Sequence, residues 1–171
     1  EQTLCAITGA KYCVVVSNAT AGLHIAVQAL NLPKDCEGIT SPITFLASSN
    51  CLVYNGIIPR FADIDERTYC IDPAEIEKKI TPHTKVLVPV DFAGQPADME
   101  KIKGIADLHD LRIVEDAAHA IGSIYPDGTP VGSCKFSDMT VFSFHPVKTI
   151  TTGEGGAITT NSKELYDHLV L

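Results

Sequence analysis

Hydrophobic residues along the chain alternate between short β-branched runs and longer stretches in which apolar residues recur every three or four positions. The run Cys13–Ser17 is typical of a buried strand, and Thr20–Leu30 places Leu23, Val27 and Leu30 on one helical face. The alternation continues to the end of the chain. It predicts further strands at Ile39–Ser41, Ile58–Ala62, Lys85–Val90, Arg112–Glu115, Met139–Phe144 and Gly156–Thr160.

The helices predicted between these strands begin at recognisable residues. Asp72-Pro73 places a capping side chain before a proline at the first helical position, and Asp98 is a second capping residue. Besides Thr20–Leu30, the expected helices are Ile43–Tyr54, Asp72 to about Ile80, Asp98 to about His109, and one that begins at Ser162. Strands and helices that alternate with short connections predict an α/β fold, a mostly parallel central sheet with helices on both faces.

Composition and charge narrow the possible functions. The 171 residues suffice for one domain with a sizeable core, and 45% hydrophobic with 20% charged residues is ordinary for a globular protein. The net charge of -8 argues against nucleic acid as a partner, because a phosphate backbone requires a basic face. No apolar run reaches the roughly 18 residues that span a membrane, and the first residues do not resemble a signal peptide.

The cysteines show neither a C-x-x-C pair nor zinc-ligand spacing. We expect reduced, mostly buried thiols, which indicates a reducing compartment, the cytoplasm. The chain also begins and ends inside predicted helices, so we expect residues 1–171 to be one domain of a longer protein. The six cysteines are Cys5, Cys13, Cys36, Cys51, Cys70 and Cys134.

The carboxyl ends of three predicted strands carry polar side chains, and ligands of open α/β sheets bind at such ends. After the first strand, Ser17-Asn18-Ala19-Thr20 forms a tight polar turn into a helix. The unpaired N–H groups of a helix start can bind a phosphate. The alternative is that Asn18 or Thr20 only caps the helix. No lysine of the P-loop type follows this turn.

Asp116 ends the apolar strand Arg112–Glu115 and is followed by small residues, which leave room for a flat ring. A carboxylate in this position can hold a pyridinium N–H. The alternative is that Asp116 caps a short helix. His119 can contact the same ring, or it is a core histidine whose hydrogen bonds are satisfied.

Lys148 lies in an irregular segment after the strand Met139–Phe144, with Ser143 just upstream. A lysine with little water around it has a lowered pKa and can attack an aldehyde, while the Ser143 hydroxyl can reach a phosphate. The alternative is a surface lysine before a glycine turn. Phe45, in the predicted helix Ile43–Tyr54, can stack on a flat ring or belong to the core.

In this order, the segments resemble the sugar aminotransferases of the DegT/DnrJ/EryC1/StrS family. The resemblance runs from Thr8 to Asn161, and its most specific parts are Ser143–Lys148 and Gly153–Ala157. It implies the large domain of a fold-type I, pyridoxal 5'-phosphate (PLP)-dependent transferase, working as a homodimer with active sites at the subunit interface. Lys148 is then the catalytic Schiff-base lysine, Asp116 pairs with the pyridine nitrogen, His119 lies beside the cofactor, Phe45 stacks on its ring, and the phosphate is bound by Asn18, Ala19, Thr20 and Ser143.

The resemblance further implies transamination of a nucleotide-linked 4-keto-6-deoxy sugar, with glutamate as amino donor, in bacterial surface-sugar biosynthesis. Thr40–Asn50 and Phe61–Asp65 look most like the UDP-4-amino-4,6-dideoxy-N-acetyl-β-L-altrosamine transaminase branch of the pseudaminic acid pathway. Lys148 favours transamination over the related dehydrases, which have histidine there. Family members are longer and carry a C-terminal small domain, which we expect to lie outside residues 1–171.

Three alternative functions remain. Another fold-type I enzyme, such as an amino-acid aminotransferase or a cysteine desulfurase, would use the same lysine and aspartate. A non-catalytic remnant of the fold would have little reason to retain Asp116, Ser143 and Lys148 together. A nicotinamide oxidoreductase is disfavoured, because no strand is followed by G-x-G-x-x-G.

Overall fold

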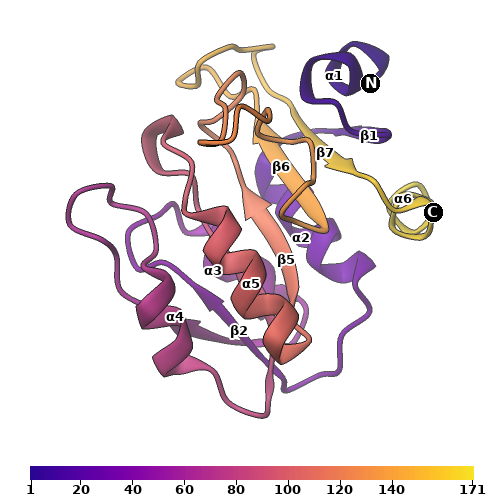
Figure 1. Ribbon diagram of the computed structural model, residues 1–171. Helices are drawn as coiled ribbons and strands as arrows, with labels where there is room; N and C mark the ends of the chain where they lie inside the picture. The colour runs from indigo at the N-terminus through magenta and orange to yellow at the C-terminus, as the bar shows by residue number, and fades with distance from the viewer.

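A computed structural model describes residues 1–171. Its seven strands form one sheet in the order β1-β7-β6-β5-β4-β2-β3 (Figure 1). All neighbouring strands are parallel except for β7, which runs antiparallel to both β1 and β6, so the predicted mostly parallel sheet is confirmed. The strands are β1 (Tyr12–Val16), β2 (Glu37–Thr40), β3 (Ile58–Phe61), β4 (Thr84–Val88), β5 (Arg112–Asp116), β6 (Met139–Ser143) and β7 (Gly156–Thr160).

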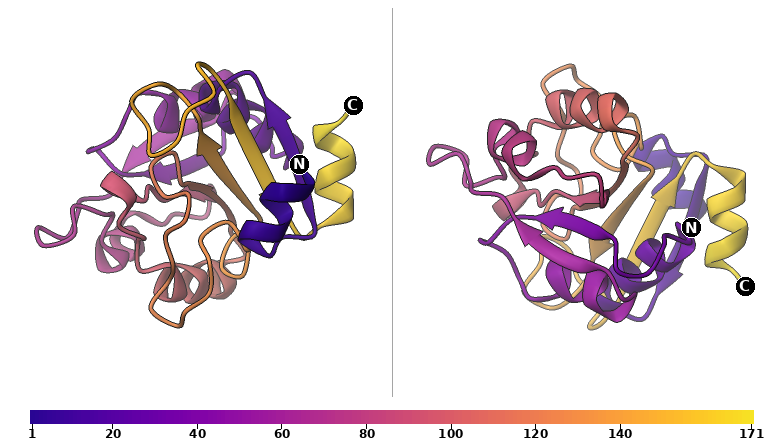
Figure 2. Two further views of the ribbon diagram at one scale, coloured as in Figure 1. Left: turned by 90° about the horizontal axis from the view of Figure 1, so that it is seen from above. Right: turned by 90° about the horizontal axis from the view of Figure 1, so that it is seen from below.

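Helices cover both faces of the sheet, as the sequence predicts (Figure 2). Apolar side chains of α2 and α3 join those of the central strands in one core, and α4 and α5 bury theirs in a second core on the other face. None of the helices combines the length and apolar composition required to cross a membrane. The helices are α1 (Gln2–Thr8), α2 (Ala19–Ala29), α3 (Ala47–Tyr54), α4 (Pro73–Lys79), α5 (Met99–His109) and α6 (Lys163–Leu169), with a short 3-10 turn η1 (Phe92–Gly94).

Several predicted elements are shifted at their ends, and for two of them the cause is visible in the structure. The helix expected from Ile43 begins only at Ala47. After Pro42, the Ser41 hydroxyl accepts a hydrogen bond from the Ile43 N–H at 3.2 Å, and this local turn competes with helix formation. The strand expected over Lys85–Val90 ends at Val88. Pro89 follows, and it has no N–H to donate to a neighbouring strand.

The carboxyl ends of β1, β5 and β6 lie along one edge of the sheet, where β7 begins. Gly156 pairs with Val16 on one side and with Ser143 on the other. This register brings the turn that follows β1 next to the end of β6. The tertiary structure therefore joins two segments that lie more than a hundred residues apart in the chain.

A side chain at Gly156 would disrupt this edge. A Cβ there would lie 2.8 Å from the Ala19 nitrogen and 2.9 Å from the Phe142 oxygen, both backbone atoms that cannot rotate away. We expect Gly156→Ala to lower the free energy of unfolding by about 1–3 kcal/mol, the usual cost of overpacking. Urea unfolding measures this value.

The matched control for this substitution is Gly104→Ala. Gly104 is exposed within α5, and a Cβ there meets nothing within 4 Å. Alanine stabilises such a helix position by about 0.5–1 kcal/mol. A Gly156→Ala protein as stable as wild type would contradict the close approach of the two segments.

Candidate functional site

A cavity of about 480 Å³ opens at the carboxyl edge of the sheet. Seven of the eight predicted site residues line it, and the eighth, His119, contacts one of them, Lys148. The structure thus brings together segments that the sequence analysis considered separately. The lining residues are Asn18, Ala19, Thr20, Leu23, Phe45, Ala47, Asp116, Ala118, Ser143, His145, Val147, Lys148 and Glu154.

One end of the cavity is the start of α2. Asn18 does cap this helix, because its Oδ1 accepts a hydrogen bond from the Ala21 N–H at 2.9 Å. The cap leaves the N–H groups of Ala19 and Thr20 without an acceptor in the chain. Helix capping and anion binding are therefore compatible here, since two free donors and the positive end of the helix dipole remain at the cavity. The buried Ser143 lines the same cavity from the end of β6.

Asp116 is 4% exposed and ends β5 at the cavity. Its Oδ1 accepts from the Ala118 N–H at 3.2 Å, and its Oδ2 accepts from the Ser48 hydroxyl at 2.6 Å. Burial raises the pKa of Asp116, while these donors and the charges of His119 and Lys148 oppose the rise. No helix follows Asp116, so the capping alternative is wrong. The carboxylate is placed to bind a cation or an N–H group.

Ser48 is a site residue that the sequence analysis missed. It is fully buried in α3, donates to Asp116, and lies 2.7 Å from the Thr44 hydroxyl. Because the Ser48 proton points to the carboxylate, Thr44 donates to Ser48. No sequence pattern could indicate a contact between residues 68 positions apart.

Lys148 lies in the irregular segment between β6 and β7, as predicted. Its Nζ is 2.6 Å from His119 Nε2. Burial lowers the pKa of Lys148, and the negative charge of Asp116 partly opposes the shift. Burial also lowers the pKa of His119. The two side chains form a pair of nitrogen bases beside a buried carboxylate, so Lys148 is suited to act as a nucleophile.

Phe45 is 73% exposed, so the alternative that it belongs to the core is wrong. Its position just before α3 makes it a wall of the cavity. An aromatic face that no other ring of the protein covers is available to a planar ligand.

A second buried carboxyl group, also missed by the sequence analysis, lies behind the site. Asp91 is fully buried, and its carboxyl group is close enough to that of Glu115 for a hydrogen bond, whereas no N–H or O–H group donates to its Oδ2. Glu115 accepts from the hydroxyls of Tyr125 at 2.6 Å and Thr140 at 2.7 Å. Burial and the charge of Glu115 hold the pKa of Asp91 well above its ordinary value. Asp91 therefore carries the proton that the two carboxyl groups share.

This proton makes stability depend on pH. The folded protein keeps the Asp91 proton at pH values at which the unfolded chain has released it. The contribution of this proton to the free energy of unfolding is therefore complete below about pH 3.8, and it is lost as the pH rises through the raised pKa. Asp91→Asn replaces the shared proton with an amide N–H. We expect this variant to be at least as stable as wild type at neutral pH, with a smaller dependence on pH above 3.8, measured by urea unfolding.

The control for Asp91→Asn is Asp107→Asn, at an exposed position of α5 that pairs with Lys103. Surface pairs contribute little, so its pH profile should follow that of wild type. A neutral-pH stability of Asp91→Asn well below wild type would show that Asp91 is ionised in the folded protein.

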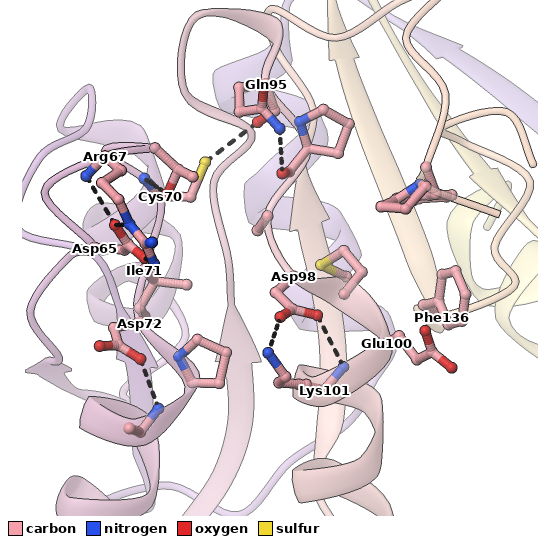
Figure 3. Close-up of a pocket in the computed structure, with 18 of the residues that line it drawn as sticks. Asp65, Arg67, Cys70, Ile71, Asp72, Gln95, Asp98, Glu100, Lys101 and Phe136 are labelled. Atoms are coloured by element: carbon pink, nitrogen blue, oxygen red, sulfur yellow. Dashed lines mark hydrogen bonds and ion pairs between the residues drawn. The ribbon is translucent and has the colours of Figure 1, made fainter. Parts of the chain in front are cut away.

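A larger cavity of about 690 Å³ lies away from this site, near the starts of α4 and α5 (Figure 3). All of its charged groups except Glu100 already have partners within the protein. Arg67 pairs with Asp65 at 3.0 Å, and Lys101 pairs with Asp98 at 2.7 Å. Asp72 and Asp98 cap the two helices. The unpaired helix N–H groups and the lysine of lowered pKa line the smaller cavity instead. The structure also contains no cluster of side chains suited to bind a metal ion, and all six thiols are free, five of them buried.

Comparison of the chain with known proteins gives the same family that the sequence motifs resemble. The model of the DegT/DnrJ/EryC1/StrS aminotransferase family matches residues 1–171. The chain is 44% identical over 169 residues to the spore coat polysaccharide biosynthesis protein SpsC of Bacillus subtilis, which covers 99% of this chain and 43% of SpsC.

Solved structures show the same fold. Helicobacter pylori PseC, an aminotransferase involved in pseudoaminic acid biosynthesis, superposes with a TM-score of 0.94 at 38% identity, over 100% of this chain and 46% of PseC. NtdA of Bacillus subtilis, solved with the bound cofactor PMP, superposes with a TM-score of 0.92 at 34% identity, over 99% of this chain and 38% of NtdA. The chain spans less than half of the length of each of these relatives. It belongs to the DegT/DnrJ/EryC1/StrS aminotransferase family.

Proposed function

We propose that the protein containing this chain is a PLP-dependent aminotransferase that transfers the amino group of glutamate to a nucleotide-linked 4-keto-6-deoxy sugar. The observation that carries the proposal is one cavity lined by a buried carboxylate, Asp116, a lysine of lowered pKa, Lys148, and the free N–H groups at the start of α2. These are the groups needed for a pyridine nitrogen, an aldehyde and a phosphate. Residues 1–171 are the cofactor-binding large domain in this proposal.

The residues present fit the cofactor. The N–H groups of Ala19 and Thr20, with the Ser143 hydroxyl, would hold its phosphate. Asp116 would hold the pyridine N–H, and Phe45 would cover the ring. When bound, PLP supplies an electron sink that stabilises a carbanion next to the reacting nitrogen.

The protein's own groups bind, orient and move protons. Lys148 as a free amine can take a proton from the α-carbon of the amino donor, because an uncharged Nζ has a lone pair that can bind it. Asp116 is kept in one orientation by Ser48 and Ala118. Its charge favours a protonated ring nitrogen.

The substrate class rests on the relatives. SpsC is named for spore coat polysaccharide biosynthesis, and PseC for pseudoaminic acid biosynthesis. These names support a sugar substrate in surface-polysaccharide synthesis, with a UDP-4-keto-6-deoxy-N-acetylhexosamine as the specific proposal. Large apolar side chains are exposed along α3 and just before it, which supports a homodimer that covers them. These side chains are Phe45, Leu46, Val53 and Tyr54.

The test uses the protein expressed from its complete natural coding sequence and incubated with PLP. We expect a visible absorbance band, and borohydride should trap a pyridoxyl group on Lys148, identified by peptide mapping. A protein with neither band nor label would refute the proposed cofactor.

A second assay identifies the substrate. The glutamate-treated protein should regain its original spectrum with a UDP-4-keto-6-deoxy-N-acetylhexosamine, but not with 2-oxo acids other than 2-oxoglutarate. Recovery with a range of 2-oxo acids would indicate an amino-acid aminotransferase, and sulfide release from cysteine would indicate a desulfurase.

A further inference from the structure

The turn η1 places a backbone N–H on the far nitrogen of His119. Ala93 N–H donates to His119 Nδ1 at 3.2 Å, while the opposite ring nitrogen, Nε2, faces Lys148. The histidine therefore stands between a backbone donor and the predicted nucleophile. The Thr149 hydroxyl also donates to the His119 carbonyl oxygen at 3.3 Å, which ties the lysine segment to this residue.

The backbone of this turn adopts a conformation that L-residues rarely take. Ala93 has φ 54° and ψ 22°, in the left-handed region, and Gly94 follows with φ 87°. Such strain persists only where surrounding contacts hold the backbone, and it is concentrated at functional sites.

Contacts on both sides hold the turn in place. The Ser123 hydroxyl donates to the Gly94 oxygen at 2.8 Å. Asp91 N–H donates to the Asp116 oxygen at 3.0 Å, and Asp91 Oδ1 accepts from the Ala97 N–H at 3.0 Å. The strained turn is thus fixed to the strand end that carries the site carboxylate, and its Ala93 N–H is directed at His119.

This donor decides which nitrogen of His119 carries the proton. A neutral imidazole has one N–H and one acceptor nitrogen, and the assignment follows from its hydrogen bonds. Since Nδ1 accepts from Ala93, the proton is on Nε2. An N–H at Nε2 cannot face an ammonium group, because both would be donors. The 2.6 Å contact is satisfied only if Nε2–H donates to an uncharged Lys148 amine.

We propose that Ala93 holds His119 as the Nε2–H tautomer and that His119 is a positioning residue that keeps Lys148 as a free amine. The charged and titratable groups that face Lys148 are Asp116 from β5, His119 itself, and His145 and Glu154 around the cavity. Asp116 favours the ammonium form, and burial favours the amine. The hydrogen bond from His119 also favours the amine, because its N–H can donate only to an uncharged Nζ.

That a free Lys148 amine serves catalysis rests on the proposed function. The hydrogen bonds from Ala93 to His119 and from His119 to Lys148 do not depend on it. The experiment therefore uses the cofactor-free, full-length protein. Acetic anhydride acylates only uncharged amines, and mass spectrometry of the Lys148 peptide at a series of pH values measures the fraction of free amine. An exposed lysine, Lys79, provides the internal reference.

His119→Asn is the informative variant, because its amide can still accept from Ala93 but is too short to reach Lys148. Losing the donor raises the pKa of Lys148. We expect acylation of Lys148 at neutral pH to fall by about threefold to tenfold, the contribution of one hydrogen bond. His119→Gln, which can present an N–H at the place of Nε2, should restore most of the wild-type rate.

Two variants of the turn test its role separately. Gly94→Ala places a Cβ 3.0 Å from the His119 oxygen at a left-handed position, so the turn must move, and we expect acylation to fall as in His119→Asn. Ala93→Gly keeps the N–H and relieves the strain, so it should match wild type.

An unchanged or increased acylation of Lys148 in His119→Asn would overturn the proposal. An increase would mean that Lys148 is an ammonium donating to Nε2, the opposite tautomer. Failure of the proposed function is distinct from this result, since it appears as a missing pyridoxyl label on Lys148 in PLP-treated protein.

Discussion

Lys148→Ala is expected to abolish transamination by the full-length protein, with turnover falling by more than about a thousandfold. A proton-transfer group alone contributes about 10²–10⁴-fold, and this lysine also provides the nucleophilic amine. Its Nζ is the only lysine amine lining the cavity, so no neighbouring lysine can replace it. Steady-state assay with glutamate and the keto sugar measures the loss.

Two controls separate this chemistry from charge and folding. Lys148→Arg keeps a positive charge but provides no free amine, since the guanidinium stays protonated, and it should be as inactive as the alanine variant. Lys79→Ala removes an exposed lysine of α4 and should retain wild-type turnover. Near-normal activity of Lys148→Ala would refute the assigned role.

Asp116→Asn is expected to lower turnover by about 10- to 1000-fold while leaving the fold intact. The amide is isosteric, and its oxygen can still accept from the Ala118 N–H while its NH2 group donates to the Ser48 oxygen, but it has no charge. A neighbouring opposite charge shifts a pKa by about 1–3 units, so without it the protonated fraction of the ring nitrogen falls by the corresponding factor. The loss should appear in kcat more than in KM, because the phosphate and the ring face are still bound.

Ser48→Ala tests the same carboxylate without changing it. The Ser48 hydroxyl stabilises the ionised form of Asp116 across 2.6 Å, so its removal raises the pKa of Asp116 further. Asp116 then stays protonated up to a higher pH. The acidic limb of the pH–rate profile should therefore shift to higher pH, with near-normal turnover at alkaline pH. A profile that keeps its shape would mean that Ser48 only fills space. Ser49→Ala is the matched control, because the Ser49 hydroxyl donates only to the Leu46 oxygen.

The fold class could be predicted from the chain's local patterns alone, together with which polar residues gather at one edge of the sheet. Short apolar runs between helical patterns predicted every strand of the sheet, since apolar runs and helical spacings are local properties of the chain. Local patterns sufficed to select Asp116, Ser143 and Lys148 as candidates. Each lies at the carboxyl end of a strand or in the loop after it, where parallel sheets bind their ligands. Errors lay at element boundaries such as Ile43 and Val90, where a side-chain turn and a proline outweighed the apolar pattern.

The contacts that set protonation could not be predicted, because they depend on how distant segments pack together. Ser48 and Asp116 are 68 positions apart, and Asp91, which lies between β4 and η1, contacts Glu115 of β5. The backbone N–H that donates to His119 belongs to Ala93, whose positive φ no local sequence pattern predicts. Burial and hydrogen-bond partners depend on which segments the sheet order places side by side, and no spacing along the chain encodes that order. The sequence therefore identified the groups that can react, and the packing around them decides which of those groups carry protons.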